Sequence, residues 1–178
     1  MKTNLILLGG ESLKNKAWIE QVRDGLQANF ETEILYYDHW QVAEGKISFA
    51  VETGKLLQMT AGLTDFILFA KSAGSWMSLQ AVAEGKVKPD KFVIVGPAWD
   101  WAINNGFKPE ELINQVSVPV LIIDKSFDPS LAFADLQQML ADHKRPNLQL
   151  VEIPGDTHNY EDIVGLTKLV NEFVGQST

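Results

Sequence analysis

Short apolar runs alternate along the chain with longer segments in which apolar residues recur at helical spacing. The apolar runs cover residues 4–8, 33–37, 65–70, 91–95, 118–123 and 147–153. Most of them are apolar at nearly every position, which is typical of strands in a parallel sheet with helices on both faces. The pattern therefore predicts six buried parallel strands.

The segments between these runs predict helices. In residues 16–30, the side chains of Trp18, Val22, Leu26 and Phe30 are four positions apart and form a stripe on one face of a helix. Similar stripes predict helices over residues 49–63, 72–83, 131–142 and 163–174. Alternating strands and helices indicate an α/β protein, built as a three-layer α/β/α sandwich around a six-stranded parallel sheet.

Length, charge and composition narrow the classes of protein. A chain of 178 residues suits a single domain, which we expect to span residues 1–178. The net charge of −8 argues against nucleic acid and against anionic membranes as partners. No apolar run approaches the roughly 18 residues that a membrane-spanning helix needs. The first apolar run also lacks a signal-peptide cleavage site, so we expect a cytoplasmic protein.

Polar residues follow several of the predicted strands directly. In an open parallel sheet, ligands bind at the carboxyl ends of the strands, so these positions are the candidates for a site. The polar segments are residues 9–12, Ser72 with its neighbours, residues 124–129 and residues 154–158. We expect them to meet at one edge of the sheet.

Ser72 stands where the third apolar run stops and a helical pattern starts. A serine on a sharp strand-to-helix turn needs small residues two positions before and after it, and Ala70 and Gly74 occupy those positions. Serine is also a favoured residue at the start of a helix, so this position alone leaves a purely structural role open. The flanking pattern favours a nucleophile.

A serine nucleophile needs a base to take its proton and a carboxylate to orient that base. Asp128 and His158 follow later strands and supply these two groups in the order serine, acid, histidine. Asp128 precedes Pro129, a pairing that also starts turns. Asp124, at the end of the fifth predicted strand, is the competing acid.

Three segments resemble the α/β-hydrolase superfamily, particularly its small members without a separate lid. They are the turn at residues 70–74, the acid segment at residues 122–129 and the histidine loop at residues 153–158. The resemblance implies a minimal α/β-hydrolase fold with strand order 2-1-3-4-5-6. It also implies a carboxylesterase-like serine hydrolase that cleaves a small ester, thioester or amide through an acyl-enzyme. The sequence departs from the family pattern at Ala70, where glycine is commoner, and at Gly9, where relatives often carry histidine.

The same resemblance implies an oxyanion hole made of backbone amides. One donor would be the amide of Ala73, at the start of the helix, and the other that of Gly10 or Glu11 in the first loop. Trp99 and Trp101 follow the fourth strand and are candidates for lining an acyl or aromatic pocket, although packing on the core is an equal alternative. Lys71 is a candidate for attracting an anionic substrate. The alternative is that this lysine is solvated or paired with a nearby carboxylate.

The segment between Trp101 and the fifth strand at Val118 is short. Lids in related proteins usually enter there, so we expect an open and shallow site. Trp76, one helical turn beyond Ser72, is expected in the core. His39 and His143 follow other segments and are expected to be surface or turn residues.

Other chemistries find less support in the sequence. Asp65 and Ala70 replace the glycines of a phosphate-binding loop, Gly9-Gly10 lacks the third glycine of a dinucleotide site, and no histidine pair has metal-ligand spacing. The chain has no cysteine, which excludes a thiol nucleophile and thiolate ligands. We therefore expect no cofactor and no metal. The alternatives are a catalytically silent binding or scaffolding protein of the same fold, and a flavodoxin-type domain that binds a small anionic ligand.

Overall fold

Six parallel strands form one sheet at the centre of the protein. The structure, a computed structural model, describes residues 2–42, 45–141 and 146–175. The strands are β1 (Thr3–Leu8), β2 (Phe30–Ile34), β3 (Phe66–Lys71), β4 (Lys91–Val95), β5 (Val120–Lys125) and β6 (Leu148–Ile153). Their order in the sheet is β2-β1-β3-β4-β5-β6, and every neighbouring pair is parallel. The predicted strand order is therefore confirmed.

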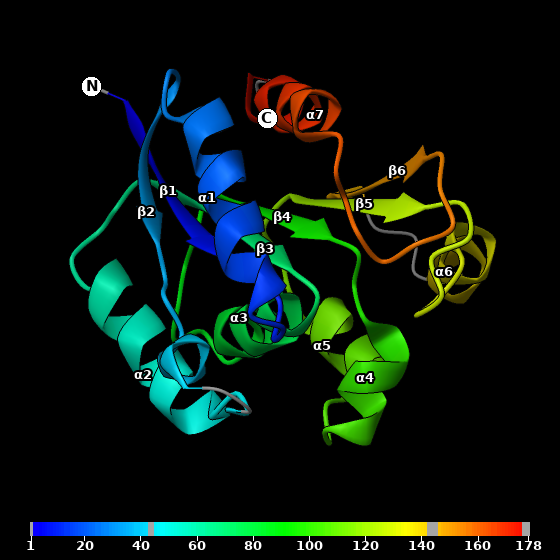
Figure 1. Cartoon of the computed structure of the whole chain (residues 1–178), viewed down its shortest axis with the longest axis horizontal. Helices are drawn as coiled ribbons and strands as arrows, with labels where there is room; N and C mark the ends of the chain where they lie inside the picture. Colours follow the sequence, from blue (N-terminus) through cyan, green and yellow to red (C-terminus); the bar gives the residue numbers. More distant parts are fainter. Residues whose placement is uncertain (1, 43–44, 142–145, 176–178) are drawn as a thin grey trace.

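Helices cover both faces of the sheet and make the three layers that the sequence predicts. They are α1 (Lys14–Leu26), α2 (Phe49–Thr60), α3 (Ala73–Ala83), α4 (Trp99–Asn104), α5 (Pro109–Gln115), α6 (Phe133–Ala141) and α7 (Ile163–Gly175), with a short 3₁₀ helix η1 (Asp38–Gln41). Helices α1 and α7 lie on one face, and α2, α3, α4 and α5 lie on the other (Figure 1). The fold is thus an α/β sandwich.

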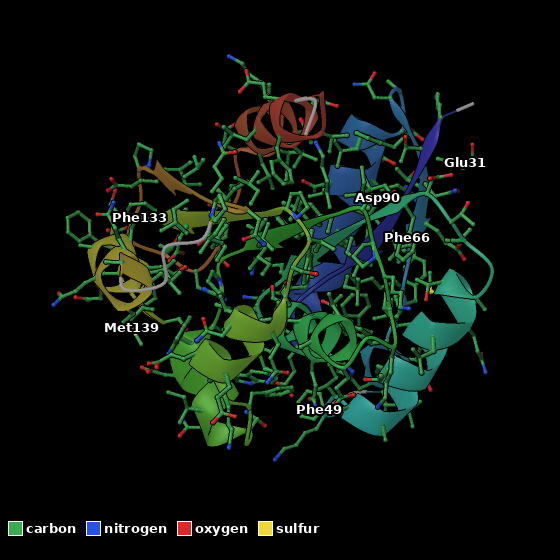
Figure 2. All side chains as sticks on the ribbon, turned by 180° about the vertical axis from the view of Figure 1, so that it is seen from behind. Glu31, Phe49, Phe66, Asp90, Phe133 and Met139 are labelled. Carbon is green, nitrogen blue, oxygen red and sulfur yellow. The ribbon has the colours of Figure 1, made fainter. Side chains whose placement is uncertain are left out.

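The apolar runs are buried because both faces of the sheet are covered. All residues of β3 and β5 are buried, whereas the edge strand β6 is only partly buried. At the amino ends of β3 and β4, the amide of Asp90 donates to the carbonyl oxygen of Phe66 at 2.8 Å, and the two residues lie beside each other in Figure 2. Ser72 follows the opposite, carboxyl end of β3.

The second strand begins three residues earlier than the apolar pattern predicts. Phe30 belongs to β2, where it pairs with Thr3, and the preceding helix ends at Leu26. A buried phenylalanine fits the helical stripe and the strand equally well, so spacing alone placed it wrongly. Tyr37 lies beyond the strand, and its hydroxyl donates to the Gly9 carbonyl oxygen at 2.8 Å.

Helices α4 and α5 are further elements that the sequence pattern did not predict. They are short, and Pro109 starts the second of them. The predicted helix over residues 131–142 begins at Phe133, and its last residue lies outside the described residues.

Gly74 allows the first loop to approach helix α3 closely. A Cβ atom at this position would overlap the carbonyl oxygen of Gly9 and lie 2.6 Å from the hydroxyl oxygen of Tyr37. The small residue that the sequence places two positions after Ser72 therefore has a packing role. It brings the loop after β1 against the start of α3.

We expect Gly74→Ala to lower the free energy of unfolding by about 1–3 kcal/mol, because the new methyl group forces the first loop away from α3. Gly54→Ala is the matched control within a helix, since a Cβ there meets nothing within 4 Å. That substitution should raise the free energy of unfolding by about 0.5–1 kcal/mol. Urea unfolding of both variants tests the difference, and equal stability of Gly74→Ala and wild type would contradict it.

Candidate active site

Ser72 occupies a strained turn between β3 and α3. Its φ and ψ angles are 53° and −122°, and it is the one non-glycine residue with positive φ among those that the structure describes. Such a conformation costs about 1–3 kcal/mol and persists only where the surroundings enforce it. The amide of Ser72 donates to the Val95 carbonyl oxygen at the end of β4, at 3.1 Å. The turn therefore continues the hydrogen bonding of the sheet.

His158 and Asp128 lie next to this serine in a continuous hydrogen-bonded chain. The Nε2 atom of His158 is 3.0 Å from the Ser72 Oγ atom, and its Nδ1 atom is 2.9 Å and 3.0 Å from the two carboxylate oxygens of Asp128. An ionised carboxylate only accepts, so the imidazole proton belongs on Nδ1. The Nε2 atom is then free to accept the Ser72 hydroxyl proton.

The environment of Asp128 keeps its carboxylate ionised. Burial opposes ionisation, but hydrogen bonds from His158, the Ser130 amide and Tyr160 outweigh it and lower the pKa of Asp128 below its ordinary value. The Ser130 amide donates to Asp128 Oδ1 at 2.9 Å. Only 1% of the Asp128 side chain is exposed, against 28% for His158. The histidine therefore faces solvent while its acid partner is enclosed.

The first loop lies beside the serine. A Cβ atom on Gly10 would be 3.1 Å from the Cβ atom of Ser72. Ala73 is the first residue of α3, and amides in the first turn of a helix have no carbonyl partner within that helix. The arrangement thus brings Gly10 and the amino end of α3 to the same place as the Ser72 side chain.

Glu11 is fixed in position by three aromatic side chains. Its carbonyl oxygen contacts His39 Nε2 at 2.6 Å and accepts a hydrogen bond from Trp40 Nε1 at 3.1 Å. Its carboxylate accepts from Trp101 Nε1 at 3.1 Å. His39 was expected to be a surface or turn residue, but it is partly buried and holds this loop. Its contact is made across the fold, so no spacing in the sequence indicates it.

The sequence also gives expectations for one further histidine, His143, and for one tryptophan, Trp76. His143, predicted to be a surface residue, lies outside the described residues. Trp76 is buried at 1% exposure, as predicted.

Trp99 does not line an open site. It is only 2% exposed and packs edge-on against Trp76, with ring centroids 5.3 Å apart. The structural alternative for Trp99 is therefore the correct one. Trp101 is the partly exposed member of the pair, and it packs against Phe49 and Phe107. The first residues of α4 are therefore amphipathic, since Trp99 packs in the interior whereas Trp101 lies beside Glu11.

Lys71 differs from the sequence expectations, since it is not accessible to a substrate, is not solvated and forms no ion pair with the residues that the structure describes. Its side chain is buried at 4% exposure, with Nζ 5.5 Å from the ring centroid of Trp18 and 5.7 Å from that of Tyr160. Burial lowers the pKa of Lys71 to about 8, although the Asp128 carboxylate opposes this. The lysine before the serine therefore forms part of the protein interior.

Asp124, the competing acid, does not contact His158. Its Oδ1 atom is 2.7 Å from the Tyr160 hydroxyl oxygen, and the same oxygen is 2.9 Å from Asp128 Oδ2. Tyr160 was not among the predicted site residues. It lies two positions after His158, and the only signal in the sequence is an aromatic residue within a polar segment.

In the described ranges, 2–42, 45–141 and 146–175, no cluster of three or more histidine, aspartate or glutamate side chains is arranged to hold a metal ion. None of the helices in the same ranges is long and apolar enough to span a membrane.

Solved structures that resemble this chain have the α/β-hydrolase fold. An uncharacterized protein from Bacillus cereus matches 98% of this chain with a TM-score of 0.77 and 16% identity, and the chain spans 60% of its length. Est1E from Butyrivibrio proteoclasticus, with bound ferulic acid, has a TM-score of 0.75 and 17% identity over 97% of this chain and 88% of its own. A serine hydrolase involved in carbazole degradation has a TM-score of 0.76 and 13% identity over 97% and 90%.

No protein-family model matches the sequence. No curated protein matches it either. The structural likeness at low identity shows the fold, and the protein has an α/β-hydrolase fold.

We expect Lys71→Met to stabilise the protein by about 2 kcal/mol near neutral pH, because it removes a buried charge. The folded state releases the Lys71 proton at about pH 8, below the ordinary value of 10.5 for the unfolded chain. The unfolded chain therefore binds more protons between these values, and the stability of the wild type rises with pH across that window. The advantage of the variant should be complete below about pH 8 and shrink above it.

Lys14→Met is the control for this test, since Lys14 is exposed. Its effect on the unfolding midpoint should be small and independent of pH. Thermal unfolding of both variants across this pH range gives the comparison. A destabilised Lys71→Met protein, or a gain that is constant with pH, would show that the buried charge is not the cause.

Proposed function

We propose that the protein is a serine hydrolase that cleaves a small ester, thioester or amide through an acyl-enzyme. The observation that carries this proposal is the chain from Ser72 Oγ to His158 Nε2, at 3.0 Å, and from His158 Nδ1 to Asp128, at 2.9 Å. A nucleophile, a base and an orienting acid at hydrogen-bond distance are what acyl transfer requires. The α/β-hydrolase fold of the solved neighbours supports the same reaction class.

In the proposed mechanism, His158 acts first as a base and then as an acid in each half of the reaction. Ser72 Oγ attacks the acyl carbon while its proton passes to His158 Nε2, and Asp128 stabilises the imidazolium that forms. His158 then gives this proton to the leaving group, which departs and leaves the acyl group on Ser72. A water molecule then attacks the acyl carbon as it gives a proton to the same nitrogen, and His158 passes this proton to Ser72 Oγ as the bond to the acyl group breaks and the acid leaves.

Backbone amides are the proposed donors for the oxyanion. Ala73 contributes the first, at the positive end of the α3 dipole. Gly10 or Glu11 contributes the second, from a loop that His39, Trp40 and Trp101 hold in place. Donors fixed before the reaction stabilise the developing charge without reorganisation.

The proposed substrate is small and carries an apolar or aromatic acyl group. The segment from β4 to β5 contains only the short helices α4 and α5, so the site is expected to be open rather than covered by a large insertion. Beside Glu11, the rings of Trp101, Phe49 and Phe107 pack together, with centroids 5.1–6.1 Å apart. Est1E binds ferulic acid, an aromatic acid, in the same fold. An open site favours a carboxylesterase-like reaction over one that needs a sealed pocket.

The two alternatives are weaker explanations of the geometry. A silent binding or scaffolding protein has no need for a serine in a strained turn at 3.0 Å from a histidine. A flavodoxin-type domain leaves the same chain of three residues without a purpose. We therefore favour an enzyme.

Ser72→Ala should lower kcat/KM for short nitrophenyl esters by at least about 10³-fold, since no other group replaces the nucleophile. A fluorophosphonate probe should label the wild type at Ser72 and leave the variant unlabelled. Ser75→Ala is the matched control: Ser75 is buried one turn further along α3, and its hydroxyl has no hydrogen-bond partner. Folded wild type that stays unlabelled while a control esterase reacts would refute the proposal.

A further inference from the structure

Tyr160 joins two buried carboxylates that the proposed reaction uses unequally. Its hydroxyl is 2.7 Å from Asp124 Oδ1 and 2.9 Å from Asp128 Oδ2. Asp124 is 1% exposed, Asp128 is 3% exposed and Tyr160 is 2% exposed, so water has little access to any of them. Asp128 belongs to the proposed catalytic chain, whereas Asp124 has no assigned role.

The number of protons decides how these three groups interact. A phenol carries one proton and donates one hydrogen bond at a time, and an ionised carboxylate donates none. If both aspartates were ionised, the Tyr160 hydroxyl could donate to only one of them. At the other contact, the phenol oxygen and a carboxylate oxygen would face each other without a proton between them and would repel each other. One additional proton, on Asp124, gives each contact its own hydrogen bond.

The surroundings of Asp124 fit a neutral carboxylic acid. Its Oδ1 atom accepts a hydrogen bond from the Lys125 amide at 3.0 Å, and a hydroxyl oxygen there can accept that bond while donating to Tyr160. Its Oδ2 atom is buried without any hydrogen-bond partner. An unpartnered buried oxygen costs far less on a neutral acid than on an anion. Burial, the largest effect, raises the pKa of Asp124 to about 7.

We infer that Asp124 is held as a neutral acid that donates its proton to Tyr160, while Tyr160 donates to Asp128, so that both act as positioning residues for the Asp128–His158 pair. The positioning role rests on the proposed function, whereas the protonation of Asp124 does not. In this relay Asp128 Oδ2 receives a hydrogen bond from each side, and its carboxylate is fixed relative to the imidazole.

Two lysines face Tyr160, which links the aspartates. The Nζ atoms of Lys71 and Lys125 are 5.7 Å and 5.2 Å from the Tyr160 ring centroid. Lys125 is engaged elsewhere, with Thr157 Oγ1, the Asn159 carbonyl oxygen and the Glu161 carboxylate.

No salt bridge joins either lysine to Asp124 or Asp128 in the part of the chain that the structure describes. The charged groups around Asp124 and Tyr160 are Lys71, Lys125, Glu161, Asp128 and, when it is protonated, His158. None of them supplies a direct ion pair to keep Asp124 ionised.

Infrared spectroscopy tests the protonation without relying on activity. Wild type should show a carboxylic-acid carbonyl band at about pH 5 that disappears near about pH 7, as Asp124 loses its proton. The band should be absent from Asp124→Asn and unchanged in Asp156→Asn, since Asp156 is exposed. A wild-type spectrum without a band that depends on Asp124 would overturn the inference.

The pH dependence of stability gives a second test of the same proton. A folded pKa above the ordinary 3.8 means that the folded state binds the proton more tightly, so this contribution to stability is lost as pH rises between 3.8 and about 7. Asp124→Asn does not titrate. Its Tm relative to wild type should therefore rise, by about 5 °C, between about pH 5 and about pH 8.5. A relative Tm that falls over this range would mean that Asp124 is an anion.

Kinetics test the positioning role. Tyr160→Phe should lower kcat for a nitrophenyl ester about tenfold with little change in KM, because Asp128 loses one charge-assisted hydrogen bond. Asp124→Asn should also lower kcat, since the Lys125 amide holds the carboxamide oxygen toward Tyr160 and draws its proton away from Asp128. Tyr36→Phe is the control, because Tyr36 is an exposed tyrosine bonded to Glu20.

The outcomes separate this inference from the proposed function. Wild type that neither hydrolyses esters nor reacts with a fluorophosphonate refutes the hydrolase, while the infrared and stability tests still decide the state of Asp124. An active wild type whose kcat is unchanged in both Tyr160→Phe and Asp124→Asn overturns the positioning role. Circular dichroism of each variant shows whether it is folded, and either variant alone suffices for the kinetic test.

Discussion

The strained turn at Ser72 is the constraint on which the rest of the site depends. A positive φ at a serine persists because the flanking elements fix it: its amide bonds to the end of β4, and Gly74 lets the first loop pack against α3. The same contact that stabilises the turn places Gly10 beside Ser72. One steric requirement thus determines the position of the hydroxyl group and of the loop proposed to bind the oxyanion.

The histidine loop needs an anchor, since β4 and β5 separate its strand from the strand that precedes Ser72. Tyr160 provides it. Its ring packs on Gly96, where a Cβ atom would lie 2.6 Å from the ring, and its carbonyl oxygen accepts from Trp18 Nε1 at 2.6 Å. The loop is therefore tied to β4 and α1 immediately after His158. Rigid support of this kind keeps a base within reach of its nucleophile.

Buried charge is concentrated at the carboxyl end of the sheet. Lys71, Asp124, Lys125 and Asp128 are all buried there, and burial makes each ionised group costly unless it has partners. The pKa shifts have this cause: burial moves Lys71 and Asp124 toward their neutral forms, whereas the hydrogen bonds of Asp128 keep it ionised. Such a cluster of groups with shifted pKa values is typical of functional sites.

The sequence by itself determined the fold class, the strand order through its resemblance, and three side chains that the structure brings together. The spacing of apolar residues and the length of apolar runs indicate local structure, and in a parallel sheet the carboxyl ends of the strands meet at one edge. Only the tertiary structure decided that Phe30 belongs to β2, that Trp99 and Lys71 are buried, and that His39 and Tyr160 support the site. These properties depend on contacts between residues distant in the chain, such as the hydrogen bond between Asp124 and Tyr160, which no local pattern encodes.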